Sequence, residues 1–149
     1  MNSFEKLTIL TSEVAVTGFM TPRCLRIVKT MGFSTVINMM PPSPSTIDDI
    51  YEKGLANKVR KFKLEYRHFP ISSTQDIDQN MIDHFREVMA EIPKPAVIFS
   101  RSGQRAVTLW ALAMQDVLTS EQLAEKASRA GHDISGITTD EQIAKPRAA

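Results

Sequence analysis

The apolar residues of this chain occur in short runs that are separated by stretches with helical spacing. Residues 7–10 and 13–16 are rich in β-forming residues and flank a Thr11-Ser12 pair, which predicts an opening pair of strands. Residues 33–40 are apolar with little alternation, as expected for a strand that is buried on both faces of a parallel sheet. Two further strands are predicted at residues 63–70 and 96–99.

Helical signals fill the intervals between these strands. Thr21 is a favourable N-cap before Pro22, and Gly32 supplies a C-terminal stop, so a helix is predicted between them. Apolar residues within 82–92 follow one face of another helix, which Pro93 ends. Further helices are predicted over residues 46–58, 104–117 and 120–130, and the tail beyond residue 138 is predicted to be frayed.

Strands that alternate with helices through the middle of the chain predict an α/β fold, with a central mixed or mostly parallel sheet flanked by helices. We expect a single domain over residues 1–149. Ligands of such sheets bind beyond the carboxyl ends of the strands. The strand at 96–99 leads directly into Ser100 and then into a helix, so this junction is the first place to look for a functional site.

The composition narrows the classes of function. A chain of 149 residues with 42% hydrophobic and 23% charged content can form one hydrophobic core. The formal net charge of +1 gives no general attraction to nucleic acid or to an anionic membrane. No run approaches the roughly twenty apolar residues of a membrane span, and the first ten residues lack a signal-peptide pattern. Cys24 is the single cysteine, which excludes an internal disulfide or a multi-cysteine metal site. We therefore expect a cytoplasmic protein with no nucleic-acid or membrane partner, no metal and no cofactor.

The residues that carry chemistry are concentrated in the loop after the strand at 96–99. A short loop of small and cationic residues at a helix N-terminus gathers backbone N–H groups and the helix dipole around one point, which favours an anion. Gly103 allows a turn without a side chain in this cradle, and Arg105 can return its guanidinium to bind two oxygens. The residues alone leave open an ordinary turn with two solvated arginines. The candidate anion-binding residues are Arg101, Ser102, Gly103, Gln104 and Arg105.

Residues 97–106, Val-Ile-Phe-Ser-Arg-Ser-Gly-Gln-Arg-Ala, resemble the active loop of single-domain rhodaneses and of the bacterial DUF442 family, the beta-lactamase hydrolase-like phosphatase-like proteins. The resemblance to the DUF442 family extends over nearly the whole chain. It implies a fold like that of tyrosine and dual-specificity phosphatases, and hydrolysis of phosphomonoesters or sulfur transfer through a cysteine intermediate. The other similar segments are residues 16–22, 32–38, 66–70, 108–112 and 130–136.

The chain departs from the family pattern in three places. Ser100 occupies the position of the nucleophilic cysteine, and a serine hydroxyl ionises far less readily than a thiol, so we expect Ser100 to be inert while the anion cradle remains. Four residues separate Ser100 from Arg105, as in rhodaneses and one fewer than in tyrosine phosphatases. The arginine and acidic residues that usually follow the strand ending at Asn38 are replaced by Met39, Met40 and prolines.

Phosphatases of this shape use an aspartate on a neighbouring loop as a general acid. Asp76 is the first candidate for this role and Asp78 the second. Both also lie just before a helix, where a carboxylate caps the first turn, and we favour this capping interpretation. We interpret as structural residues His68, Asn38, Trp110 and the His132-Asp133 pair, which suits a helix cap and turn.

Several functions are compatible with these features. The first is a phosphatase-like hydrolase domain that acts on phosphomonoesters and is inactive or impaired because of Ser100. The alternatives are a rhodanese-like sulfurtransferase and a non-catalytic domain that binds its ligand without turnover. In each case the expected partner is phosphate, sulfate, or a phosphorylated or sulfur-containing small molecule. A plain interaction domain, in which the loop binds nothing, is the last alternative. An Arg105 side chain turned away from the loop, together with loop amides that are paired internally, would indicate it.

Overall fold

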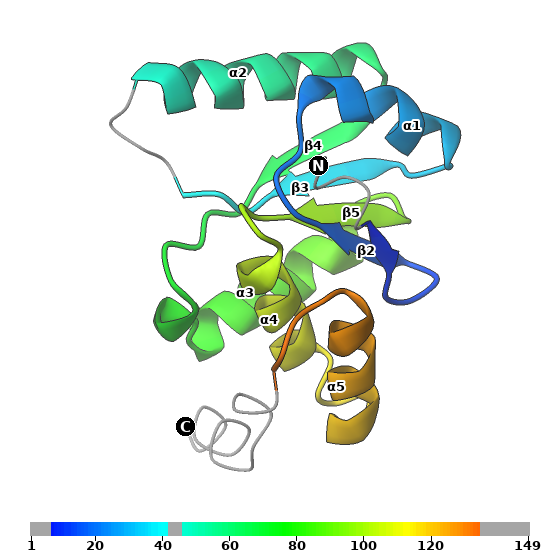
Figure 1. Cartoon of the computed structure of the whole chain (residues 1–149), viewed down its shortest axis with the longest axis vertical. Helices are drawn as coiled ribbons and strands as arrows, with labels where there is room; N and C mark the ends of the chain where they lie inside the picture. The colour runs from blue at the N-terminus through cyan, green and yellow to red at the C-terminus, as the bar shows by residue number, and fades with distance from the viewer. Residues whose placement is uncertain (1–6, 42–45, 135–149) are drawn as a thin grey trace.

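The computed structural model describes residues 7–41 and 46–134 and contains a five-stranded sheet between two layers of helices (Figure 1). The strand order is β1-β2-β5-β3-β4, with β1 antiparallel to β2 and all other neighbours parallel. The predicted α/β fold with a mostly parallel sheet is therefore confirmed, while the predicted tail beyond residue 138 lies outside the described residues. The strands are β1 (Thr8–Ile9), β2 (Val14–Thr17), β3 (Thr35–Asn38), β4 (Glu65–His68) and β5 (Ala96–Phe99).

The helices cover the two faces of the sheet in separate groups. In Figure 1, α1 and α2 lie on one side of the strands, and α3, α4 and α5 lie on the other. Side chains of successive strand residues point to opposite faces, so Val97 joins the first layer and Ile98 the second. The helical elements are η2 (Pro22–Cys24), α1 (Leu25–Thr30), α2 (Thr46–Lys61), η3 (Thr74–Asp76), α3 (Gln79–Glu91), α4 (Gln104–Ala113) and α5 (Ser120–Arg129).

The carboxyl ends of the parallel strands meet at one edge of the sheet. Phe99 at the end of β5 is aligned with Thr17 on one neighbour and with Asn38 on the other. The loops that follow are also joined, since the Phe19 N–H donates to the Arg101 carbonyl oxygen at 2.9 Å. β5 is the central strand, so this register places the loop that begins at Ser100 in the middle of the edge where ligands of parallel sheets bind.

Two of the observed element boundaries depart from the prediction for identifiable reasons. The strand predicted at 33–40 is observed only over Thr35–Asn38, because the Phe33 N–H donates to the Val28 carbonyl oxygen at 3.3 Å and the Met40 N–H to the Asn38 Oδ1 at 2.9 Å instead of to a neighbouring strand. The helix predicted over 104–117 ends at Ala113. There the Arg86 Nε donates to the Ala113 carbonyl oxygen at 3.0 Å, which satisfies an acceptor that a longer helix would have used itself.

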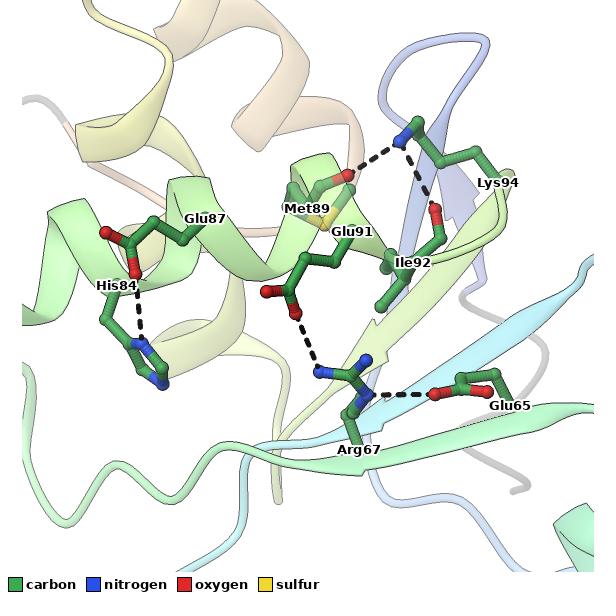
Figure 2. A network of polar contacts seen from close by, with 8 residues as sticks. All are labelled: Glu65, Arg67, His84, Glu87, Met89, Glu91, Ile92 and Lys94. Atoms are coloured by element: carbon green, nitrogen blue, oxygen red, sulfur yellow. Dashed lines mark hydrogen bonds and ion pairs between the residues drawn. The ribbon is translucent and has the colours of Figure 1, made fainter.

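Polar contacts hold the C-terminal end of α3 against the sheet (Figure 2). The Lys94 Nζ donates to the carbonyl oxygens of Met89 at 2.6 Å and Ile92 at 3.3 Å, both near the end of the helix. Arg67 on β4 lies with its Nη1 3.4 Å from a carboxylate oxygen of Glu91. Because the ion pair is partly exposed it adds little energy, and the cap by Lys94 is the more important of the two contacts.

A partly buried chain of polar side chains connects β3, β4 and α2. The Tyr66 hydroxyl donates to a carboxylate oxygen of Glu52 at 2.6 Å and accepts from the Asn38 Nδ2 at 3.1 Å. The Asn38 Oδ1 accepts the Met40 N–H at 2.9 Å. Asn38 thus has the structural role predicted for it. Burial, followed by the hydrogen bond to Glu52, raises the pKa of Tyr66 above its ordinary value.

The raised pKa of Tyr66 predicts a loss of stability in alkaline solution. The folded protein keeps the phenol proton at pH values where the unfolded chain, with a tyrosine pKa of about 10, has released it. The free energy of unfolding should therefore decrease as the pH rises above about 10. Urea unfolding between neutral and alkaline pH measures this slope, and Tyr66→Phe should make it shallower. An unchanged slope in Tyr66→Phe would contradict the assignment.

Candidate functional site

The loop after β5 directs backbone N–H groups toward one oxygen atom. Ser100 is 1% exposed, and its Oγ accepts hydrogen bonds from the Gly103 N–H at 3.1 Å and the Ala106 N–H at 3.3 Å. Gly103 is the N-cap residue of α4, with a φ of 95°. The positive end of the α4 dipole therefore lies at the same point as these amides. The two amides are thus paired within the loop, and the N-terminus of α4 at this point favours negative charge. Anion binding by the loop stays a prediction.

A hollow of about 350 Å³ lies in front of this loop. Arg105 lines it and donates from Nη1 to the Ile71 carbonyl oxygen at 3.3 Å, so its guanidinium faces the segment that follows β4. Arg101, which is exposed, adds a second guanidinium. Among the described residues that line the hollow there is no Asp, Glu, His or Lys. The complete set is Ser72, Ser73, Thr74, Ser100, Arg101, Ser102, Gln104 and Arg105.

The two candidate aspartates occupy different positions. Asp78 is the N-cap of α3, and its side chain accepts the Met81 N–H at 2.9 Å, which confirms the capping interpretation for this residue. The capping interpretation is wrong for Asp76, which is exposed as the last residue of η3, a helix whose N-cap is Ser73. A catalytic role of Asp76 stays a prediction. The residues of this segment that line the hollow are Ser72, Ser73 and Thr74, which carry hydroxyls.

The contrast between these aspartates leads to a stability prediction. Asp78→Ala should lower the free energy of unfolding by about 1 kcal/mol, because the first turn of α3 loses its side-chain acceptor. Asp76→Ala is the matched control and should change the stability by less than about 0.5 kcal/mol, as is usual for an exposed position. Urea denaturation of both variants measures the difference, and equal losses would show that the Asp78 cap is not what stabilises the helix.

His132 contacts the loop from a segment much later in the chain. The His132 N–H donates to the Ala127 carbonyl oxygen at 2.9 Å, and Gly131 has a φ of 88°, so the predicted helix cap and turn is confirmed. The His132 Nδ1 also lies 2.9 Å from the Gln104 Oε1. The Gln104 Nε2 donates to the Thr108 Oγ1 at 3.2 Å, which leaves the amide oxygen to accept from His132. His132 thereby holds the first residue of α4.

His132 also fills the space behind Gly103. A Cβ atom at position 103 would lie 2.9 Å from the His132 Nε2 and 3.3 Å from the Thr17 carbonyl oxygen. Both distances are shorter than ordinary van der Waals contact, so the loop requires glycine for its space as well as for its φ. Sequence reasoning identified the cap but missed this contact, because a hydrogen bond between residues 28 positions apart leaves no periodic signal.

The described residues contain no group of three His, Cys, Asp or Glu side chains that could hold a metal ion. Within the same ranges, no helix is long and apolar enough to cross a membrane. Cys24, the free cysteine, is buried beside α1, and its Sγ lies 3.5 Å from the Thr21 Oγ1.

Comparison with known families agrees with this arrangement. The family model of the beta-lactamase hydrolase-like protein, phosphatase-like domain, matches residues 6–117. The chain belongs to this family. No curated protein matches the chain. The match ends at residue 117, and His132 follows it in the chain.

Solved structures confirm the phosphatase-like fold. A candidate phosphatase from Neisseria meningitidis has a TM-score of 0.79 and 16% identity, covering 95% of this chain and 99% of that chain. The core catalytic domain of the PP-IP phosphatase Siw14 from S. cerevisiae, in complex with citrate, has a TM-score of 0.64 and 10% identity, covering 94% and 89%. Kinase associated phosphatase, with its catalytic-site cysteine substituted by serine, has a TM-score of 0.68 and 14% identity, covering 91% and 88%.

Proposed function

We propose that this phosphatase-like domain binds phosphomonoesters at loop 100–105 and, with Ser100 in the nucleophile position, does not hydrolyse them. The observation that carries the proposal is the composition of the hollow, which has two arginines and no carboxylate or imidazole among its described lining residues and lies at the N-terminus of α4. Because the single cysteine suits a reducing compartment, we place this function in the cytoplasm.

The proposed binding of phosphomonoesters rests on the positive charges around the hollow and on the geometry of their hydrogen-bond donors. Arg105 lies half-buried between the loop and the segment after β4, where its planar guanidinium can bind two oxygens of a phosphate. Arg101 adds a second positive charge at the exposed rim. The N-terminus of α4 supplies its dipole at the same place. A doubly charged phosphomonoester is therefore attracted by each charged group among the described residues that line the hollow.

The proposed absence of hydrolysis rests on the low acidity of the Ser100 hydroxyl. A cysteine thiol, with an ordinary pKa of about 8.5, is ionised readily at a helix N-terminus beside arginine. A serine hydroxyl is far less acidic, and serine nucleophiles depend on a neighbouring base to remove the proton. No described residue that lines the hollow is such a base. Ser100 thus keeps its proton, and its Oγ serves as an acceptor for the loop amides.

Sulfur transfer is a second candidate for the reaction that a cysteine at position 100 would support. The four-residue spacing between Ser100 and Arg105 favours it, since this is the spacing seen in the resemblance to rhodaneses. A thiolate at position 100 would attack the outer sulfur of thiosulfate, forming a persulfide and releasing sulfite, and cyanide would then remove the sulfur as thiocyanate. Thiocyanate formation by Ser100→Cys in the presence of thiosulfate and cyanide would identify this activity.

Binding of inorganic phosphate and of phenyl phosphate to the unaltered protein tests the proposed function directly. Isothermal titration calorimetry should show binding that weakens with added salt. Arg105→Met, which keeps the length of the side chain and removes the charge, should raise the dissociation constant at least about tenfold. Arg26→Met is the matched control, because Arg26 is exposed on α1 and does not line the hollow. Equal affinities for the parent and Arg105→Met would overturn the proposal.

A further inference from the structure

The hollow at loop 100–105 is larger than a phosphate group. Its volume of about 350 Å³ lies in the range of sites that bind small organic molecules. Arg105 joins two walls of the hollow, because its Nη1 donates to the Ile71 carbonyl oxygen at 3.3 Å, directly before the lining segment 72–74. A phosphate that is bound by Arg105 and the loop therefore leaves the space beside segment 72–74 for the rest of the ligand.

The described residues that line the hollow are all polar. Each of them is a serine, a threonine, a glutamine or an arginine, and no aliphatic or aromatic residue is among them. Most small-molecule sites have mainly apolar walls, against which the apolar body of a ligand packs. In this hollow an apolar body would displace water from polar groups and give them no partner in return. The body that fits is one that carries hydrogen-bonding groups of its own.

Two hydroxyls in segment 72–74 can bind such a body. Ser72 is exposed and Thr74 is half-buried, and neither side chain makes a hydrogen bond within the described residues. The Ser73 Oγ differs, because it accepts the Gln75 N–H at 3.1 Å as the N-cap of η3. A serine or threonine hydroxyl rotates freely and can donate as well as accept. Ser72 and Thr74 can therefore pair with hydroxyl groups of a ligand in either direction.

The charges of the hollow favour a ligand with one phosphate and an uncharged body. Arg101 and Arg105 are the charged groups among its described lining residues, and together they match the two negative charges of a phosphomonoester. A body with an ammonium group would be repelled by these guanidiniums and would find no carboxylate among the same lining residues. A body with a further carboxylate or phosphate would bring more negative charge than the two arginines balance.

We propose that the ligand of this site is the monophosphate of an uncharged, polyhydroxylated molecule, such as a sugar phosphate, and that Ser72 and Thr74 determine this specificity. The inference rests on the proposed binding of phosphomonoesters at loop 100–105. The phosphate binds Arg105 and the loop, while hydroxyl groups of the body exchange hydrogen bonds with Ser72 and Thr74. A site built in this way discriminates against a ligand that lacks hydroxyls, because its own polar groups are then left unpaired.

Two ligands of similar shape separate this inference from phosphate binding alone. Glucose 6-phosphate and cyclohexylmethyl phosphate each carry a phosphate on a methylene group attached to a six-membered ring, but only the sugar has hydroxyls. In calorimetric titrations of the full chain, glucose 6-phosphate should bind at least about fivefold more tightly. Glucosamine 6-phosphate, which adds an ammonium group to the same sugar, should bind more weakly than glucose 6-phosphate. In ¹H–¹⁵N correlation spectra, glucose 6-phosphate should shift the amide peaks of Ser72 and Thr74 more than inorganic phosphate does.

The double variant Ser72→Ala/Thr74→Val removes both hydroxyls with little change in volume. It should lose most of the preference for glucose 6-phosphate over cyclohexylmethyl phosphate, while its affinity for inorganic phosphate should stay within about twofold of the parent. Thr30→Val is the matched control and should keep the full preference, because Thr30 is exposed on α1 and does not line the hollow.

The outcomes distinguish this inference from the proposed function. If inorganic phosphate binds through Arg105 but the sugar phosphate binds no more tightly than cyclohexylmethyl phosphate, the inference is overturned and the proposed function stands. An unchanged preference in the double variant, or tighter binding of glucosamine 6-phosphate than of glucose 6-phosphate, would also overturn the inference. If none of the phosphates binds, both are wrong.

Discussion

Ser100→Cys is expected to give this protein phosphatase activity toward aryl phosphates. The Gly103 and Ala106 amides, the α4 dipole and Arg105 surround position 100 and should hold a cysteine there as a thiolate. The thiolate attacks phosphorus, the phenolate leaves with the electrons of the P–O bond, and water then hydrolyses the phosphocysteine. Release of p-nitrophenolate from p-nitrophenyl phosphate should rise at least about 10³-fold over the parent protein.

Two double variants show which groups support the activity of the cysteine form. Arg105→Met in the cysteine background should lower kcat/KM by roughly 10²-fold or more, because the charge that develops on the phosphoryl oxygens loses its donor. Asp76→Asn in the same background tests the predicted general acid. An acid matters most for a poor leaving group, so this variant should slow an alkyl phosphate more than p-nitrophenyl phosphate. A Ser100→Cys protein without activity would show that phosphate ester hydrolysis is the wrong chemistry for this loop.

Gly103→Ala should damage the same loop through its backbone. The φ of 95° costs an alanine about 1–2 kcal/mol, and the added Cβ would lie 2.9 Å from the His132 Nε2 and 3.3 Å from the Thr17 carbonyl oxygen. We expect a loss of stability of roughly 2–4 kcal/mol and a fall of at least about tenfold in phosphate affinity. Urea denaturation and calorimetric titration with phosphate measure these two effects.

Gly32→Ala is the matched control for this prediction. Gly32 has a φ of 93°, and a Cβ there meets no atom within 4 Å, so the substitution introduces the backbone cost without the collision. It should destabilise the protein by about 1 kcal/mol and leave phosphate binding unchanged. If Gly32→Ala and Gly103→Ala prove equally damaging, the close approach of His132 and Thr17 is not what requires glycine at position 103.

The parts of the molecule that could be predicted from the sequence are those that follow from local pattern. The apolar run at 96–99, followed by small and cationic residues, predicted a buried strand that leads through a short loop into a helix, because these signals act over a few residues. Anion binding by this loop stays a prediction. The Asp78 cap followed from the same local rules. The early end of α4 did not, because the hydrogen bond from Arg86 to Ala113 joins residues 27 positions apart.

The candidate site was predicted only as far as the loop itself. Resemblance to a family singled out Ser100 and Arg105, but it could not show that Ser72, Ser73 and Thr74 line the same hollow. Nor could it show the contact of His132 with Gln104. These two features depend on how segments that are distant in the sequence pack against each other. The pattern of residue types along the chain does not indicate such packing.

The contact between His132 and α4 bears on where this protein can be divided. Leu123, Ala127 and Ile134 are buried in the same core cluster as α3 and α4, although all three follow the last residue matched by the family. A chain cut after residue 117 would expose the apolar surface that these side chains cover and would lose the imidazole behind Gly103. The residues that share this core thus extend beyond the residues that the family model matches, and the segment after α5 supports the loop that follows β5 from behind.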